Sequence, residues 1–122
     1  MILLVDEDDD FRCDLARRLR DSGYRVSECI SAGEVSAAAA EAIRCLIVDY
    51  RVGGADGLRL ADEFHAAHPH APVLMVSADR DAAGDADVHR RDFLYFFCKP
   101  LSGDVLTRVV ATLAPDVGRA AA

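Results

Sequence analysis

One carboxylate in this sequence stands directly after a short apolar run and directly before a glycine-rich segment. Residues 45–48 are apolar, Asp49 ends the run, and Gly53, Gly54 and Gly57 follow. A short apolar run bounded by turn residues is typical of a strand buried on both faces of a parallel sheet. Ligand chemistry gathers at the carboxyl ends of such strands. Asp49 is therefore a candidate ligand, nucleophile or cap.

Other polar groups also stand where apolar runs end. Asp6 and Glu7 follow the first apolar run, Ser77 follows a valine-rich run, and Lys99 follows an aromatic run. Carboxylates gathered at one sheet edge repel each other unless a hard cation neutralises them, and oxygen ligands favour Mg²⁺ or Mn²⁺. An aspartate, a divalent cation, a hydroxyl and a lysine together suit phosphoryl transfer to a carboxylate oxygen.

These groups need a sheet that brings the strand ends together. Strands are predicted at residues 2–5, 24–29, 45–48, 72–76 and 93–98. Helical patterns follow each of them, which indicates right-handed crossovers and a single α/β domain. The predicted fold is a flavodoxin-like (βα)5 doubly wound parallel sheet with strand order 2-1-3-4-5. In that order the first and third strands are neighbours, so Asp6 and Glu7 should lie beside Asp49.

The helices differ in how clearly the sequence predicts them. Phe11, Leu15 and Leu19 give the first helix an apolar stripe, with Arg12 and other arginines on its remaining faces. Ser22-Gly23 should stop this helix, Ser31 should cap an alanine-rich helix to about residue 41, and Asp56-Gly57 should open a helix that ends near His68-Pro69. The segment 79–92 predicts only a short or mobile helix. Ser102 should cap the last helix, whose predicted apolar stripe is Val105, Leu106, Val109, Val110 and Leu113.

Composition narrows the function classes. The chain has 122 residues, 52% of them hydrophobic, and a formal net charge of −7. Residues 1–114 are predicted to form one domain, and residues 115–122 a disordered tail or the start of a linker. An acidic chain without a basic stripe argues against nucleic-acid binding by this segment, and no apolar run is long enough for a membrane span. We expect a cytoplasmic protein.

Cysteine and histidine spacing gives no strong metal signal. The four cysteines, at positions 13, 29, 45 and 98, are widely spaced and predict reduced packing residues. His65, His68 and His70 crowd near one predicted helix end. We expect solvated histidines there, with a transition-metal site as the alternative.

The chain resembles the receiver domain of two-component response regulators. The resemblance rests on LLVDEDDDFR, LIVDYRVGGADGL, PVLMVSA and FFCKPL, each at the end of the matching strand. The order of these motifs matters, as do their spacings of 28 residues from Asp49 to Ser77 and 22 from Ser77 to Lys99. The resemblance covers about residues 1–114.

The resemblance implies a role for each of these residues. Asp49 would accept a phosphoryl group from the phosphohistidine of a histidine kinase or phosphotransfer protein, in a domain that catalyses only its own phosphorylation and dephosphorylation. Mg²⁺ (or Mn²⁺) would be held by Asp6, Glu7, Asp49 and the backbone carbonyl of Arg51. Ser77 and Phe96 would form the switch, Lys99 would pair with the phosphoryl group, and the Lys99-Pro100 peptide would be cis.

The chain departs from the family pattern at several positions. Glu7 replaces the commoner aspartate, Phe96 has no hydroxyl, and glycines after Val52 suggest a more flexible loop. The weak segment 79–92 leads to the hypothesis that the face formed by helix four, strand five and helix five is labile until phosphorylation orders it. A second hypothesis is that Arg51 and Asp79 pair across the phosphoryl group and shield it from water.

Two other functions remain open at this point. A degenerate receiver would bind proteins without being phosphorylated. A haloacid-dehalogenase-like phosphohydrolase would also use an aspartyl nucleophile and Mg²⁺, but its Asp-x-Asp-x-Thr/Val pattern is missing because Asp10 fills the last place. A downstream protein or a fused output domain is the expected target of a receiver, with a homodimer as a further possibility.

Overall fold

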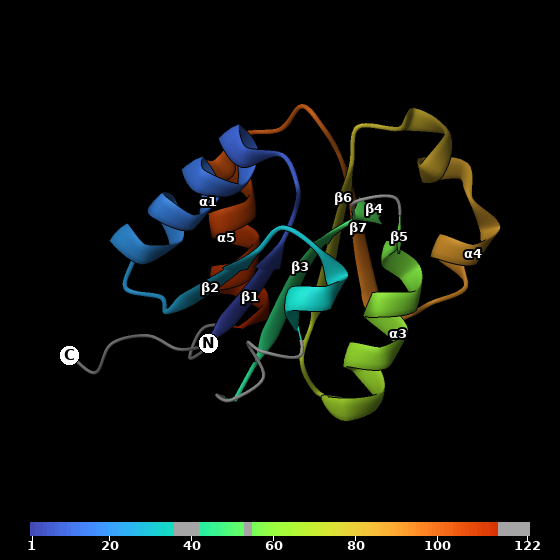
Figure 1. Cartoon of the computed structure of the whole chain (residues 1–122), viewed down its shortest axis with the longest axis horizontal. Coiled ribbons are helices and arrows are strands. Elements are labelled where there is room, and N and C mark those ends of the chain that lie inside the picture. The colour runs from blue at the N-terminus through green and yellow to red at the C-terminus, as the bar shows by residue number, and fades with distance from the viewer. Residues whose placement is uncertain (36–41, 53–54, 115–122) are drawn as a thin grey trace.

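The computed structural model describes residues 1–35, 42–52 and 55–114 of the chain. Five parallel strands form one sheet in the order β2-β1-β3-β6-β7, and Figure 1 shows helices on both sides of it. The strands of this sheet are β1 (Ile2–Val5), β2 (Val26–Cys29), β3 (Cys45–Asp49), β6 (Val73–Ser77) and β7 (Leu94–Cys98). Counted within this sheet alone, the order is 2-1-3-4-5, so the predicted flavodoxin-like fold is confirmed.

Two helical layers cover the sheet. The helical elements are α1 (Asp9–Asp21), η1 (Ala32–Glu34), α3 (Gly57–Ala67), η2 (Arg80–Gly84), α4 (Ala86–His89) and α5 (Gly103–Leu113). Helices α1 and α5 pack on one face, while α3 and α4 lie on the other (Figure 1). This is the arrangement that right-handed crossovers produce around a doubly wound sheet.

Successive side chains of the central strands enter opposite clusters of the core. In β1, Ile2 and Leu4 pack with α1 and α5, whereas Leu3 and Val5 pack with α3. Since strand side chains alternate between faces, a strand covered on both sides must be apolar at every position. This requirement explains why unbroken apolar runs predict the central strands.

The predicted helix boundaries follow local hydrogen-bonding chemistry. The side chains of Asp8, Asp56 and Ser102 each accept a backbone N–H in the first turn of α1, α3 and α5. Helix α1 ends at Asp21, and Gly23 adopts a φ of 95°, which glycine reaches without the steric cost that a side chain adds. The predicted cap at Ser102 and the predicted stop after α1 are therefore confirmed.

The structure also departs from several predictions. A short antiparallel hairpin of β4 (Arg51–Val52) and β5 (Ala55–Asp56) follows β3, where only a loop is predicted. The segment after β6 forms a 3-10 turn and a four-residue helix, as its weak pattern predicts. Ser31 precedes the 3-10 turn η1 without a side-chain cap. The rest of the helix predicted to residue 41, and the predicted tail at 115–122, lie outside the described residues.

The exposure of two helix residues, Val105 and Arg12, differs from the prediction. Val105 is 44% exposed, although it is predicted to belong to the buried stripe of α5. Its neighbour Leu106 faces the core, and consecutive helical residues are rotated by about 100° from each other. Arg12, predicted on an outer face of α1, is only 8% exposed. The burial of Arg12 is explained by its contacts with Asp6, Asp9 and Glu28.

The four cysteines are described by the structure, and two of them depart from the predicted packing role. All four thiols are free; Cys29 and Cys45 are buried, whereas Cys13 and Cys98 are exposed and so do not pack in the core. Burial raises the pKa of the Cys45 thiol to about 12. Within residues 1–35, 42–52 and 55–114, no helix has the length and apolarity required to cross a bilayer.

Candidate functional site

The carboxyl ends of four strands bring the predicted site residues to one edge of the sheet. β1 pairs with β3, β3 with β6, and β6 with β7, all in parallel. The residues that end or follow these strands are Asp6, Asp49, Ser77 and Lys99. The predicted juxtaposition at this edge is therefore present.

Lys99 joins the two carboxylates of the site. Its Nζ donates to Asp6 Oδ2 at 2.9 Å and to Asp49 Oδ2 at 3.2 Å, and lies 3.8 Å from Asp8 Oδ2. The same ammonium lies 4.3 Å from the centre of the Phe11 ring. The lysine side chain is 12% exposed and Asp6 is 1% exposed, so this charge cluster is largely withdrawn from water.

Burial and neighbouring charges shift the pKa values of both partners. Burial, followed by the negative charge of Asp49, raises the pKa of Asp6, although hydrogen bonds from the Asp8 backbone and Lys99 oppose that shift. Burial lowers the pKa of Lys99, but its hydrogen bond to Asp6 and the charges of both carboxylates outweigh burial and raise it. The site therefore holds a charged lysine beside carboxylates that it only partly neutralises.

Asp49 stands at the end of β3 with its two oxygens in different surroundings. Oδ2 accepts from Lys99, while Oδ1 accepts the backbone N–H of Arg51 at 3.1 Å. The side chain keeps 14% exposure, unlike the buried Asp6. Asp49 is thus the carboxylate of the pair that solvent and an incoming group can reach.

The hairpin after β3 fixes the backbone beside Asp49. Gly57 N–H donates to the carbonyl of Tyr50 at 2.9 Å, and Tyr50 N–H donates to the carbonyl of Val76 at 2.8 Å. A Cβ atom at Gly57 would collide with the carbonyl oxygens of Asp49 and Tyr50. Only glycine permits this close approach, which holds Arg51 next to the site.

Ser77 is buried at the end of β6 and bonds within its own loop. Its Oγ accepts the backbone N–H of Asp79 at 2.9 Å and lies 3.4 Å from the Asp79 carbonyl. The backbone N–H of Lys99 donates to the Ser77 carbonyl at 2.7 Å. The serine and the lysine are therefore coupled through the β6–β7 ladder, and Asp49 is not a hydrogen-bond partner of the Ser77 hydroxyl here.

The predicted metal ligands are only partly gathered. Asp6 and Asp49 meet at Lys99, whereas Glu7 is exposed. Among the residues described, no group of three or more His, Cys, Asp or Glu side chains is arranged to hold a metal ion. The donor set nevertheless suits a hard cation, because a buried aspartate with a raised pKa lies beside a second carboxylate and both offer oxygen.

Arg12 is a site residue that the sequence interpretation missed. Its Nη1 donates to the backbone carbonyl of Asp6 at 2.9 Å, and its other nitrogens pair with Asp9 at 2.7 Å and with Glu28 at 3.2 Å. The signal for its burial is helical spacing, since position 12 precedes the buried Leu15 by three residues. Arg12 thus supports the strand end that carries Asp6.

The remaining predicted positions take up defined places. Phe96 is half-buried against the core cluster that includes α3, and the Lys99-Pro100 peptide is cis as predicted. Arg51 Nη2 lies 3.7 Å from Asp79 Oδ2, with the two side chains 72% and 38% exposed. Arg51 and Asp79 are therefore close enough to attract each other at the mouth of the site.

The histidines do not form the alternative metal site among the described residues. His65 stacks on Phe93 with 3.9 Å between ring centres, and His68 lies 4.7 Å from Phe64. These two rings pack against aromatic side chains rather than standing free in solvent, which corrects part of the prediction.

Comparison with known proteins agrees with this fold. The family model described as response regulator receiver domain matches residues 2–111. The crystal structure of the receiver domain of NtrX from Brucella abortus superposes with a TM-score of 0.83 and 31% identity, covering 95% of this chain and 99% of that one.

Longer regulators also match over most of this chain. DctD of Rhizobium meliloti, a C4-dicarboxylate transport transcriptional regulatory protein, is 30% identical over 108 residues, which are 88% of this chain and 24% of DctD. FixJ of Azorhizobium caulinodans is 28% identical over 97% of this chain and 55% of its own length. The chain thus spans about a quarter of the first relative and about half of the second.

Proposed function

The chain belongs to the response regulator receiver domain family, and we propose that Asp49 is its phosphoacceptor. The observation that carries this proposal is the bridge from Lys99 to Asp6 and Asp49, with Asp49 the more accessible of the two carboxylates. This arrangement gives a nucleophile, a cation beside it and a buried acid behind it.

The proposed reaction moves a phosphoryl group from a phosphohistidine to Asp49. An Oδ atom of Asp49 attacks phosphorus, the phosphorus–nitrogen bond of the donor breaks, and the leaving imidazole takes the electron pair of that bond. Lys99 compensates the charge on the transferred oxygens because its ammonium already lies beside Asp49. The domain catalyses only this transfer and the later loss of its own phosphoryl group.

Asp6, Asp49 and the backbone carbonyl of Arg51 would hold Mg²⁺ or Mn²⁺, with Glu7 able to add an oxygen if its side chain turns inward. Such a cation, when bound, neutralises carboxylate and phosphoryl oxygens together. Arg12 maintains the position of Asp6 through the Asp6 backbone carbonyl. A cation at these oxygens would also compensate the burial of Asp6, whose raised pKa marks the cost of its charge.

Ser77 and Phe96 form the proposed switch. Phosphorylation of Asp49 would draw the Ser77 hydroxyl away from Asp79 and toward a phosphoryl oxygen. Since Ser77 and Lys99 are joined by a backbone hydrogen bond, a shift at the end of β6 would also move the end of β7. The half-buried Phe96 on β7 would repack in response. This repacking would shift the population between two conformations of the face formed by α4, β7 and α5.

Arg51 and Asp79 are proposed to lengthen the life of the phosphorylated state. Arg51 belongs to the hairpin that follows β3, Asp79 belongs to the loop that follows β6, and their charged groups are 3.7 Å apart. A pair at this place obstructs the approach of water to the phosphoryl group. Neutralising either residue should therefore speed phosphate loss, whereas an unchanged decay rate would remove the idea.

The proposed partners are a histidine kinase or phosphotransfer protein, which supplies the phosphoryl group, and a downstream protein or fused output domain. The second proposal draws on DctD and FixJ, which extend well beyond the matched region. A degenerate receiver that binds partners without phosphorylation is the alternative, and the exposed position of Glu7 is the observation that favours it.

Amide NMR during addition of Mg²⁺ and then beryllofluoride separates these two functions. For the phosphoacceptor, we expect Mg²⁺-dependent shifts around residues 49, 77 and 99 that vanish in Asp49→Ala. Asp21→Ala is the matched control, because it removes an exposed carboxylate at the C-terminal end of α1, whereas the site lies beside the N-terminal end of that helix. No response in the folded wild-type protein would contradict the phosphoacceptor proposal and favour the degenerate receiver.

A further inference from the structure

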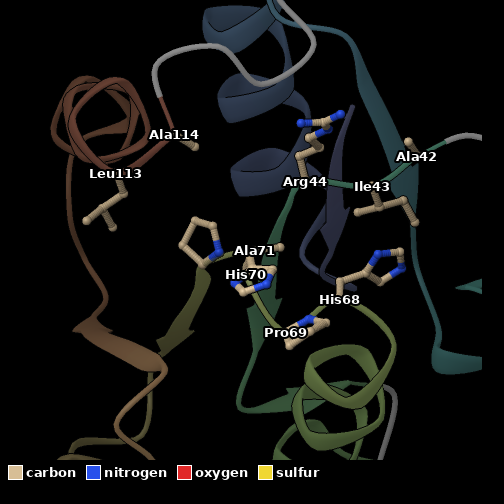
Figure 2. Close-up of a pocket in the computed structure, with 10 residues that line it drawn as sticks. Ala42, Ile43, Arg44, His68, Pro69, His70, Ala71, Leu113 and Ala114 are labelled. Atoms are coloured by element: carbon tan, nitrogen blue, oxygen red, sulfur yellow. The ribbon is translucent and has the colours of Figure 1, made fainter.

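A pocket of about 380 Å³ lies at the end of the sheet opposite Asp49, where the strands begin. Two of its lining residues, Arg44 and Pro72, directly precede β3 and β6, whereas Asp49 stands at the carboxyl end of β3. Figure 2 shows Leu113 on one side of the pocket, Ile43 on the other, and His70 between them. The pocket is therefore separate from the phosphoacceptor site, and its function does not depend on that proposal.

The walls of this pocket are mainly apolar. Ile43 and Ala114 are buried, while Ala71, Pro72 and Leu113 are half-buried around the opening. A volume of this size lies within the range of small-molecule sites, roughly 300–1,000 Å³, which are usually apolar with a few polar groups that orient the ligand. The polar side chains that could orient a ligand in this pocket are all basic.

Those polar residues are Arg44, His68 and His70. None of the ten described residues that line the pocket is acidic, although the chain has 21 acidic and 14 basic residues. Arginine carries a permanent charge in a planar fork that matches a carboxylate, and imidazoles donate hydrogen bonds and accept a proton near neutral pH. A local excess of such groups on an acidic protein is complementary to an anion.

The three basic side chains are not committed to carboxylates of the fold. Among the described residues, no ion pair involves Arg44, His68 or His70. Their backbones, in contrast, are fixed: Arg44 N–H donates to the Met1 carbonyl at 2.9 Å, and Ala71 N–H donates to the His68 carbonyl at 3.1 Å. The scaffold thus holds three basic side chains around an apolar space, and none of them is in an ion pair with another described residue.

We infer that this pocket binds a small organic carboxylate with an apolar body. The carboxylate would contact Arg44 and His70, and the apolar body would lie against Leu113 and Pro72. A bidentate arginine–carboxylate contact provides the orientation, and burial of the apolar body provides most of the remaining affinity.

Amide NMR of the complete 122-residue chain tests this site with benzoate as the probe. We expect saturable shifts at Ile43, Ala71 and Leu113, with the amides of residues 49 and 77 unchanged. Benzamide, which has the same ring without the charge, should bind at least about tenfold more weakly, because a hydrogen bond to a charged group is worth more than one to a neutral group. Inorganic phosphate, an anion without an apolar body, should also bind more weakly than benzoate.

Variants separate the pocket from general surface charge. Arg44→Gln and His70→Gln should each weaken benzoate binding, the first by about tenfold. Arg17→Gln, which removes an exposed arginine of α1 that does not line the pocket, should leave binding unchanged. Equal binding of benzamide, equal binding of phosphate, or full binding by Arg44→Gln would overturn the proposal. The proposal would also be overturned if NMR found that the segment after Ala114 contacts Leu113 and that benzoate does not displace this contact.

Discussion

Lys99 is the side chain on which the charge balance of the phosphoacceptor site depends. It bonds both Asp6 and Asp49, and Asp6 has almost no access to water. Removing one partner of a buried ion pair leaves an uncompensated charge, which costs more than the pair itself contributes. We therefore predict that Lys99→Met lowers the free energy of unfolding by about 2 kcal/mol at neutral pH, as measured by urea denaturation without divalent cations.

The matched control for this variant is Arg17→Met. Arg17 pairs with Asp14 at 2.8 Å, but its side chain is 65% exposed, so its loss should change stability by less than about 0.5 kcal/mol. Addition of Mg²⁺ should recover part of the stability of Lys99→Met, since a bound cation takes over the neutralising role. An equal, small effect of both substitutions would show that water already screens the site.

Residue types at strand ends made most of this site predictable, whereas side-chain direction did not follow from sequence. Asp6, Asp49, Ser77 and Lys99 stand where apolar runs stop, and parallel pairing brings such ends together. The role of Arg12 depends on its three acceptors, which lie on different elements. The hydrogen bonds of Ser77 to its own loop likewise depend on rotamers rather than on residue spacing.

At the scale of elements, one hydrogen bond links the end of β3 to the short helix α4. Tyr50 Oη donates to Asp85 Oδ2 at 2.6 Å, and this bond raises the pKa of the Tyr50 phenol. Asp85 also caps α4 by accepting the backbone N–H of Asp87. Tyr50→Phe should destabilise the segment from η2 to α4 by about 1 kcal/mol, which is about a fivefold increase in amide exchange at Val88 and its neighbours.

Tyr95→Phe is the control for Tyr50→Phe, because Tyr95 is 44% exposed on β7, whereas the tyrosine that donates to Asp85 is Tyr50. Beryllofluoride should slow exchange in the same segment if phosphorylation orders this face. Strong protection of residues 79–92 in the free wild-type protein would contradict the hypothesis that the face is labile. Unchanged exchange in Tyr50→Phe would show that the hydrogen bond does not hold α4.

A second link joins the residues just after α4 to α3 through charge. Arg91 pairs with both oxygens of Asp62 at 2.7 Å, and this hydrogen bonding lowers the pKa of Asp62. A lowered pKa in the folded state stabilises the protein above the unfolded pKa, about 3.9, and that contribution is lost as the pH falls through the folded value. Wild type should therefore exceed Asp62→Asn in stability at pH 7, and the difference should disappear in acid.

The size of this effect is limited by solvent. The Asp62 side chain is 47% exposed, so we expect a difference of at most about 1 kcal/mol in urea unfolding at neutral pH. Glu63→Gln is the matched control, since Glu63 pairs with Arg59 at 3.3 Å with both side chains mostly exposed. A difference between wild type and Asp62→Asn that does not shrink as the pH falls from 7 to about 2 would contradict a role for the carboxylate charge.

The strength of the local pattern decided which elements the sequence predicted well. Helices α1, α3 and α5 carry apolar stripes and caps, and their positions agree with the prediction. Helix α4 has one buried aliphatic residue, Val88, and the residues that flank it are held by contacts with distant segments. Asp85 bonds Tyr50, Arg91 bonds Asp62, and Phe93 stacks on His65. Contacts between distant segments leave no periodic signal, so its geometry required the structure.

At the scale of the whole molecule, one sheet serves two apolar clusters. Residues of β1, β3 and β6 alternate between the cluster under α1 and α5 and the cluster under α3. This sharing is also why the fold could be predicted, since doubly covered strands leave unbroken apolar runs in order along the chain. The two clusters contain different helices but share the same strands, so damage to a strand affects both.

We predict that the two clusters unfold together. Leu74 and Met75 are adjacent on β6 and fully buried, but Leu74 packs in the first cluster and Met75 in the second. Replacing either with alanine should lower the free energy of unfolding by about 2–5 kcal/mol, because each leaves a cavity in a filled core. If the sheet couples the clusters, each substitution should shift the urea midpoint of both faces equally.

Methyl NMR of Leu19 in α1 and Leu60 in α3 measures the two faces separately in one titration. Both residues are buried, and they belong to different clusters. Coincident midpoints for the two methyl groups in wild type, Leu74→Ala and Met75→Ala would establish one cooperative unit. If Met75→Ala lowered the Leu60 midpoint alone, the α3 face would unfold independently. The sheet would then not transmit a change at Asp49 across the domain by packing alone.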